Sequence, residues 1–251
     1  MTLSLTTRWI TARMRLLLRN PRAVGFTFAF PLLLLVLFSA LNANSDVKTY
    51  GENVSFAQFY TPAIACFSLV TACYTSIVIG LATARDEGLL KRVRGTPLPM
   101  SIYLGAWVTG AATVGISAVV LLFGVAVPAF GVTIFWSAIP AAIVTLLLGA
   151  SCLAACGVAV ASLVKSADQA TPVVQLTFLP LSFISGIWFP LDGAPDWLIQ
   201  IAHFFPLYHL VQAFGGCFVP GGGWAPDHLL VLAAWTVGAL AVAARRFRWE
   251  P

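Results

Sequence analysis

The chain has 251 residues, of which 59% are hydrophobic and only 9% are charged, and its formal net charge is +5. A soluble globular domain carries about a quarter charged residues, so this composition excludes a water-soluble fold. Nucleic-acid binding is not indicated either, because the basic residues cluster at the ends of apolar runs, where positive charge fixes membrane orientation.

The first 22 residues mix basic and apolar side chains, as Trp9 and Arg13 illustrate, in the composition of an amphipathic helix lying among lipid headgroups. Pro21 would end this helix. A secretory signal peptide is the alternative, but no small-residue cleavage site precedes the polar loop at Asn42. We therefore expect the N-terminus to be retained.

Six apolar runs follow, and each is long enough to cross a bilayer as a helix. They are continuously apolar, whereas barrel strands alternate between apolar and polar residues. The predicted spans cover residues 23–41, 56–84, 102–127, 134–164, 172–189 and 228–244. We predict an all-α polytopic membrane protein with six transmembrane helices, built as a single transmembrane domain over residues 1–251. Its parts are an amphipathic interfacial helix at 1–22, spans one to five within 23–190, external re-entrant helices at 191–227, the sixth span at 228–244 and a cytoplasmic tail at 245–251.

Positive charge orients these spans. Of the 14 lysines and arginines, only Lys48 falls on the side opposite the termini. Cytoplasmic loops are enriched in basic residues, so we expect both termini in the cytoplasm and a multi-pass protein of the inner (cytoplasmic) membrane.

Two segments between spans have unusual compositions. On the cytoplasmic side RDEGLLKRVRGTPLP, residues 85–99, places apolar residues at helical spacing among charges and predicts a short amphipathic helix that ends at Gly95. On the outer side, residues 191–227 are too apolar for an ordinary loop. Pro195 offers a helix start and Pro206 a helix end, and the second apolar piece, 207–218, is too short to cross a bilayer. Backbone at membrane depth must be satisfied by protein or water, so we predict a pair of helices that dip in from outside and return.

Hydroxyl and amide side chains form two stripes within the spans. The second span carries Tyr60, Ser68, Thr71 and Thr75 on one helical face, and the fifth carries Gln175, Phe178 and Ser182. Polar groups in a membrane face the bundle interior, so these stripes could line a translocation path. Hydrogen bonding between helices is the other interpretation, and it stays open for each hydroxyl.

No arrangement typical of catalysis or metal binding is apparent. The spans hold no pair such as Ser/His or Asp/Asp for an intramembrane enzyme, and no ionisable relay for a proton- or sodium-coupled carrier. His203, His209 and His228 lack metal-ligand spacing. Cys152 and Cys156, near Gly149 and Gly157, indicate close helix packing. No G-x-x-x-x-G-K-[ST] phosphate loop occurs, so any driving ATPase would be another chain.

Four features together resemble the membrane subunits of type-2 ABC exporters, the class with drug-resistance, polysaccharide and teichoic-acid export permeases. These are the basic N-terminus running into RNPRAVGFTFAFPLLLLVLF, the cytoplasmic RDEGLLKRVRGTPLP, the fifth span running into SGIWFPLDGAPDWLIQIAHFFPLYHLVQAF, and a sixth span ending in basic residues. The cytoplasmic segment matches the family at Asp86, Glu87, Gly88, Leu90, Thr96 and Pro97, although Leu89 replaces a threonine and Lys91 an acidic residue. The outer segment matches at Phe189, Pro190, Leu191, Pro195, Trp197, Leu198 and Pro206.

The resemblance implies a permease dimer, of identical or homologous protomers in membrane lipid, with two cytoplasmic ABC ATPase subunits that bind the ATP and Mg²⁺. This chain would bind no cofactor, metal or nucleic acid itself. The implied ATPase-coupling residues are Asp86, Glu87, Gly88, Leu89, Leu90, Arg92, Thr96 and Pro97. The implied substrate path runs along the second and fifth spans, and its candidates are the two stripes given above. The cargo would be an amphipathic drug, lipid or glycan-type molecule, and the short outer loops favour a drug, as in multidrug efflux, or a lipid. A non-catalytic scaffold or channel and an intramembrane enzyme are the alternatives.

Overall fold

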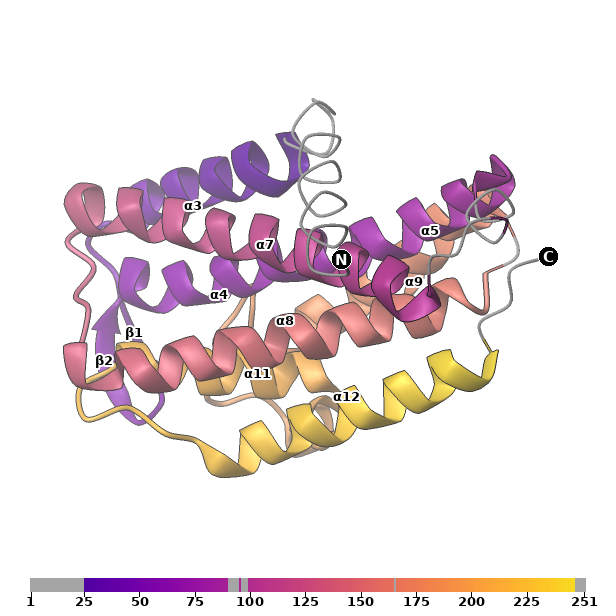
Figure 1. The fold of residues 1–251 in the computed structure, drawn as a ribbon. Coiled ribbons are helices and arrows are strands. Elements are labelled where there is room, and N and C mark those ends of the chain that lie inside the picture. The colour runs from indigo at the N-terminus through magenta and orange to yellow at the C-terminus, as the bar shows by residue number, and fades with distance from the viewer. Residues whose placement is uncertain (1–24, 90–94, 96–98, 165, 247–251) are drawn as a thin grey trace.

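The computed structural model of the protein describes residues 25–89, 95, 99–164 and 166–246. Long helices run side by side along one axis, and a short β-hairpin lies at one end of them (Figure 1). The helix predicted for residues 1–22 lies outside the described ranges. So do four of the coupling candidates, Leu90, Arg92, Thr96 and Pro97.

The helical elements follow the order of the predicted spans. The first consists of a π-helical segment, η1 (Gly25–Ala29), and α3 (Phe30–Leu41); the second consists of α4 (Phe56–Val70), a π-helical segment η2 (Thr71–Thr75) and α5 (Ser76–Asp86). Then come α7 (Met100–Phe130), the 3₁₀ turn η3 (Trp136–Ala138) with α8 (Ile139–Ala161), and α9 (Ala167–Ile184). The chain continues through α10 (Asp196–Phe204), α11 (Pro206–Gly215), the 3₁₀ turn η4 (Gly216–Phe218) and α12 (Pro226–Arg246).

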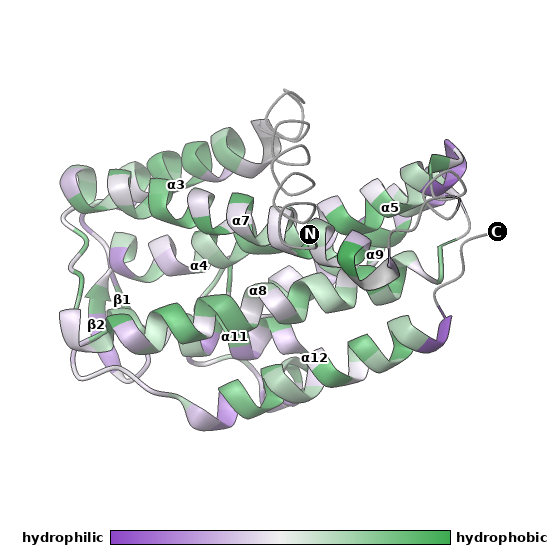
Figure 2. Ribbon diagram, in the orientation of Figure 1, coloured by the Kyte–Doolittle hydropathy of each residue, from purple (hydrophilic) through white to green (hydrophobic). Residues whose placement is uncertain are grey.

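Four of the described helices are long and apolar enough to cross a membrane. They are Phe56–Asp86, Ile102–Phe130, Trp136–Ala161 and Pro226–Arg246, and they correspond to the predicted second, third, fourth and sixth spans. The apolar helix Thr27–Leu41 is shorter. Hydrophobic residues dominate the lengths of the helices, whereas hydrophilic residues gather toward the two ends of the bundle (Figure 2). The prediction of a helical membrane protein is confirmed, and the count of six spans stays a prediction.

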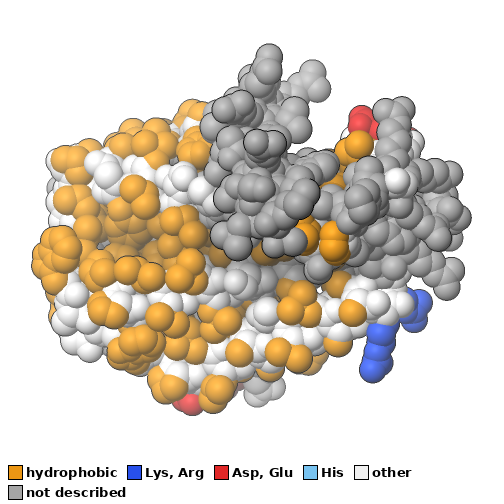
Figure 3. All heavy atoms as spheres, in the orientation of Figure 1, with side chains coloured by type: hydrophobic (Ala, Val, Ile, Leu, Met, Phe, Trp, Pro, Cys, Tyr) orange, Lys and Arg blue, Asp and Glu red, His pale blue; other side chains and the backbone are white. Residues whose placement is uncertain are grey.

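Two helices occupy the interior of the bundle. In α4 every residue from Ala57 to Val70 is buried, and in α11 the run from Pro206 to Val211 is buried. A helix that is hydrophobic on all sides packs in this way. The surrounding helices expose apolar side chains instead, such as Leu147 and Val237. Hydrophobic side chains accordingly cover much of the face seen in Figure 3, as expected of a surface that meets lipid tails.

Glycines let α8 approach its neighbours closely. A Cβ on Gly157 would lie 3.1 Å from the Tyr74 carbonyl oxygen and 3.2 Å from that of Cys73, both in the π-helical segment η2. A Cβ on Gly149 would collide with Leu210 of α11. The close packing predicted around these glycines is confirmed, because a larger residue would push against backbone at Gly157.

The hairpin between α3 and α4 was not predicted from the sequence, which indicated only a polar loop. Strands β1 (Asp46–Thr49) and β2 (Glu52–Ser55) pair antiparallel, with Asp46 opposite Ser55 and Thr49 opposite Glu52. Tyr50 and Gly51 form the two-residue turn with φ of 53° and 80°, the left-handed pair that short hairpin turns require. The all-α prediction therefore needs this addition at the end of the bundle.

Candidate functional site

The stripe predicted on the second span lies largely inside the protomer. Tyr60 and Ser68 are fully buried. The Ser68 hydroxyl donates to the Ile64 carbonyl oxygen at 3.1 Å, and the Thr71 hydroxyl donates to the Phe67 carbonyl oxygen at 3.0 Å. Thr71 and Thr75 are half-buried. These hydroxyl hydrogen bonds stay within the helix, so in this conformation they neither join helices nor face an open path.

The stripe predicted on the fifth span divides between interior and surface. Ser182 is buried, and its hydroxyl accepts a hydrogen bond from the Trp188 indole nitrogen at 3.0 Å. Gln175 is exposed, next to Leu176, which is 78% exposed. Phe178 is half-buried. Gln175 is thus the member of this stripe that a molecule outside the protomer could reach.

The structure brings the two helices together mainly through a hydroxyl pair, Tyr74 and Thr177, that the stripes did not contain. The Tyr74 and Thr177 hydroxyl oxygens lie 2.7 Å apart, and Thr177 also donates to the Val173 carbonyl oxygen at 2.8 Å. The Tyr74 hydroxyl is therefore the donor between the helices. Phe67 and Phe178 add a ring contact, with centroids 5.4 Å apart. Sequence reasoning missed Tyr74 because the π-helical segment η2 alters the helical spacing from which faces were read.

The start of the predicted coupling segment is bound to the corner between α8 and α9. The Arg85 guanidinium donates to the carbonyl oxygens of Ala161, the last residue of α8, at 3.0 Å and of Val164, just beyond it, at 2.6 Å. The Asp86 carboxylate accepts from the Ala167 backbone N–H at 2.6 Å, where α9 begins. The two side chains thus satisfy backbone groups that helix ends leave without partners.

The next coupling candidates point away from that corner. Glu87 is exposed, and Leu89 is 39% exposed. Gly88 has a φ of 69°, which is favourable for glycine and turns the chain out of α5. Glu87 and Leu89 therefore lie on the surface of the bundle, where another protein could contact them.

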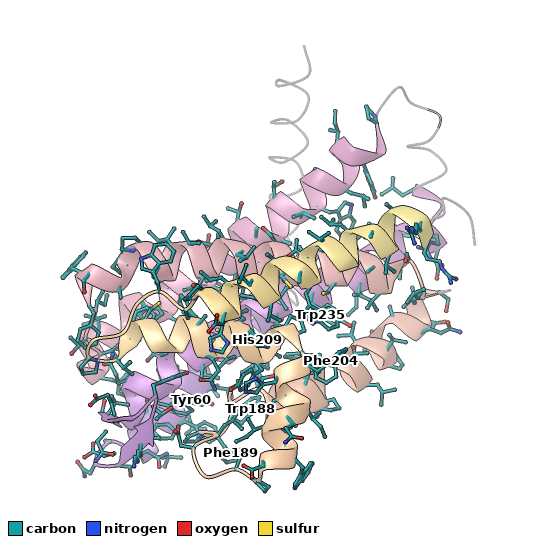
Figure 4. The ribbon with its side chains drawn as sticks, turned by 90° about the horizontal axis from the view of Figure 1, so that it is seen from below. Tyr60, Trp188, Phe189, Phe204, His209 and Trp235 are labelled. Carbon is teal, nitrogen blue, oxygen red and sulfur yellow. The ribbon has the colours of Figure 1, made fainter. Side chains whose placement is uncertain are left out.

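The structure contains two helices within residues 191–227, α10 and α11, and their placement on the outer side stays a prediction. Pro195 immediately precedes α10, and Pro206 is the first residue of α11. Pro190 is half-buried in the loop before α10, and Trp197 of α10 is 62% exposed. The two helices differ in surroundings: α11 packs among α4, α8 and α12, whereas α10 crosses the direction of the long helices (Figure 4).

Histidines join this pair of helices to α12. The Nδ1 atoms of His209 and His228 lie 2.8 Å apart, and His209 Nε2 lies 2.8 Å from the His203 carbonyl oxygen. A carbonyl only accepts, so His209 Nε2 carries a proton, and in the neutral pair His228 Nδ1 donates to His209. No cluster of three or more metal-ligating side chains occurs among the residues that the structure describes.

Two further side chains, Tyr50 and Gln58, form hydrogen bonds at the end of the bundle that carries the β-hairpin. The Tyr50 hydroxyl donates to the Val211 carbonyl oxygen of α11 at 3.2 Å, and burial raises the pKa of this phenol above its ordinary value. Gln58 donates to the carbonyl oxygens of Phe218 at 2.7 Å and Thr133 at 2.9 Å, and accepts from the Thr133 N–H at 2.8 Å. Neither was predicted from the sequence.

Comparison with known proteins agrees with this arrangement. Residues 6–219 match the family model described as ABC-2 type transporter. The chain is similar to a putative transport permease of Bacillus subtilis, YvfS, with 24% identity over 236 residues, which is 89% of each chain. It is also similar to the inner membrane transport permease YadH of Escherichia coli, with 20% identity over 190 residues, covering 75% of this chain and 73% of that protein.

Proposed function

The chain belongs to the ABC-2 type transporter family as a multi-pass permease subunit of the inner membrane, and we propose that it exports an amphipathic molecule. Permeases of this family lack an ATPase domain, and a partner subunit hydrolyses the ATP. The family match over residues 6–219 is the observation that carries the proposal.

The proposed topology has six spans, with α3 and α9 completing the four long helices. Both helices expose large apolar side chains, as helices in contact with lipid do, which supports this topology. Leu33 of α3 is 57% exposed and Leu179 of α9 is 53% exposed. Both termini are placed in the cytoplasm by the basic residues of the sequence. The pair α10–α11 then enters from the outer side and returns.

The cytoplasmic segment that begins at Asp86 is the proposed coupling helix. Exposed Glu87 and Leu89 offer a charge and an apolar contact to a docked ATPase. Arg85 and Asp86 bind the end of α8 and the start of α9. A displacement of the docked segment would therefore be passed directly to α9, one of the helices of the proposed path.

The proposed transporter contains two permeases and two ATPase subunits. A second permease, identical or homologous, would face the exposed side of α9, where Gln175 stands among the exposed Leu176 and Leu179. This mixed surface suits a path for a molecule with both polar and apolar parts. Because Tyr60, Ser68 and Ser182 are buried in this conformation, they would reach the substrate only after the segments that cover them moved apart.

A drug or a lipid fits this proposal better than a long glycan. The described outer segments are short: the hairpin strands have four residues each, and α10 has nine. They form no separate domain that could bind a polymer. The apolar and hydroxyl-bearing side chains of α9 favour an amphipathic cargo.

The charge reversal Glu87→Lys tests the coupling role. We expect normal membrane insertion and normal binding of the co-purified ATPase, but a drop of about tenfold in transport per ATP hydrolysed, the effect of losing about 1.4 kcal/mol of productive docking. The measurement uses the permease reconstituted with its co-purified ATPase in vesicles, with fluorescent lipid and cationic dye as cargo.

Glu52→Lys is the matched control, because Glu52 is equally exposed but lies on the outer hairpin. It should leave the ratio of transport to hydrolysis unchanged. An unchanged ratio for Glu87→Lys as well would remove Glu87 from the coupling mechanism. Repeated isolation of the permease without any ATPase in mild detergent would instead favour the scaffold or channel alternative.

A further inference from the structure

An apolar groove of about 470 Å³ opens on the surface of the bundle between α8 and α12. Its lining includes Cys156 and Val160 of α8, Phe204 of α10, and Trp235, Gly238 and Val242 of α12. It is separate from the α9 surface and from the coupling segment described above.

Aromatic rings close one end of this groove. The Trp235 indole nitrogen donates to the Phe204 carbonyl oxygen at 3.0 Å, and the two rings meet edge to face with centroids 5.7 Å apart. Figure 4 shows the two side chains next to each other, where the end of α10 meets α12. The indole N–H is therefore satisfied within the protein, and what the end of the groove offers to a ligand is apolar.

The residues of α12 that line the groove run from Ala234 to Val242, and Arg246 lies about one helical turn further along the same helix. Trp235 lies near the middle of α12, and Arg246 is its last residue. These positions are eleven residues apart, about 16 Å at the helical rise, and half of the hydrocarbon core is about 15 Å. An acyl chain that begins at the arginine end would reach the aromatic end.

Two arginines lie beyond the other end of the groove. Arg245 and Arg246 are exposed, and no acidic side chain pairs with either within the described part of the chain. Arg246 is four residues beyond Val242, so both lie on the same face of α12. Figure 3 shows basic side chains projecting from the end of the molecule where α12 ends. A phosphate at this level would lie beside two positive charges.

The middle of the groove has room for a chain. A Cβ built on Gly238 would meet no atom within 4 Å, and Gly238 is exposed. The neighbouring walls come from Ala159, Ala234 and Ala239. Larger residues at these four positions would fill the groove.

We propose that this groove holds one acyl chain of an anionic phospholipid, with the lipid phosphate at Arg245 and Arg246. The lipid is a resident partner of the permease and is not the exported cargo. The inference uses the proposed orientation only to name the leaflet, which is cytoplasmic, so it stands or falls independently of the transport assay.

Fluorescence quenching in vesicles tests the proposal. The full-length permease is reconstituted in phosphatidylcholine containing increasing fractions of acyl-brominated phosphatidylglycerol, or of acyl-brominated phosphatidylcholine. The signal of Trp235 is the difference between the wild type and Trp235→Phe. We expect half-maximal quenching at a brominated phosphatidylglycerol fraction at least about fivefold lower than for phosphatidylcholine, a preference of about 1 kcal/mol.

Two variants separate the chain site from the phosphate site. Gly238→Leu should abolish the preferential quenching, whereas Gly124→Leu, an exposed position on α7 with equally free space, should not change it. The double variant Arg245→Gln/Arg246→Gln should bring the phosphatidylglycerol curve onto the phosphatidylcholine curve.

Three results would overturn the proposal. One is equal quenching by the two lipids in the wild type, which means ordinary lipid contact only. Another is full phosphatidylglycerol quenching in Gly238→Leu. The third is efficient disulfide formation between two Gly238→Cys chains in membranes, because a second permease would then cover the groove.

Discussion

At the scale of single residues, Gln58 joins three distant parts of the chain at the end of the bundle that carries the β-hairpin. Gln58 lies at the start of α4. Its side-chain amide donates to the carbonyl oxygens of Thr133 and Phe218 and accepts a hydrogen bond from the Thr133 N–H. Gln58 is buried, so water does not replace these bonds if the amide is removed. One side chain thus holds the loop before α8 and the turn η4, which follows α11, against α4.

Replacing Gln58 with leucine should destabilise the folded permease. The change removes the hydrogen-bond partner of two carbonyl oxygens, those of Thr133 and Phe218, and of the Thr133 N–H. Leaving a buried polar group without a hydrogen bond costs about 1–3 kcal/mol. We expect a lower free energy of unfolding and a lower Tm, measured by thermal and denaturant unfolding in detergent.

Asn53→Leu is the control for that experiment, because Asn53 is an exposed amide on β2. The free energy of unfolding of the Asn53→Leu variant should differ from that of the wild type by less than about 0.5 kcal/mol, as is usual for surface positions. Equal losses for the two variants would mean that the Gln58 hydrogen bonds contribute nothing specific.

At the scale of elements, the second span and α9 are in contact along the side proposed to carry the path. The π-helical segment η2 interrupts the second span in its middle and presents Tyr74 toward Thr177. It also presents the Tyr74 carbonyl oxygen toward Gly157 of α8. Such local π-helical segments frequently occur at functional sites. We infer that η2 positions the hydroxyl pair that holds α9 against the bundle.

A double-mutant cycle on Tyr74→Phe and Thr177→Val measures this contact. Each change removes one hydroxyl while the shape is nearly kept. Interhelical hydrogen bonds in membranes contribute about 0.6 kcal/mol on average and up to about 1.7, so we expect a coupling energy in unfolding of about 0.5–1.5 kcal/mol.

The control cycle pairs Tyr74→Phe with Thr113→Val. The Thr113 hydroxyl donates to the Thr109 carbonyl oxygen of its own helix, α7. The two changes should be additive within about 0.5 kcal/mol. Additivity in the Tyr74 and Thr177 cycle as well would show that the hydroxyl pair does not hold the helices together.

The sequence predicted elements better than contacts. Long apolar runs determine where helices form, so the second, third, fourth and sixth spans and the pair α10–α11 could be placed in advance. The hairpin could not, because its two four-residue strands have no apolar alternation. Tyr74 and Gln58 could not be identified as joints either. Their roles depend on which segments meet in space, and a helical face drawn at 3.6 residues per turn fails across a π-helical segment.

At the scale of the whole molecule, one orientation in the membrane gives every proposed part its place. The coupling segment must reach a cytoplasmic ATPase, and α10 must lie on the outer side. Glu87 and Gln200 are both exposed, and they belong to these two regions. Basic residues remain on the side that is not translocated, so the charge distribution of the sequence predicts that the two positions lie on opposite faces of the membrane.

Cysteine labelling tests this orientation with two variants, Gln200→Cys and Glu87→Cys, in a background whose five native cysteines are replaced. A thiol reagent that cannot cross the membrane should label position 200 in intact cells with a permeable outer surface, and position 87 only after the inner membrane is opened. The same cells should show comparable labelling of both sites after detergent treatment, which controls for intrinsic reactivity. If position 87 reacted in intact cells while position 200 required opening of the inner membrane, the coupling segment would face away from the ATP supply. No cytoplasmic ATPase could then drive the permease through it.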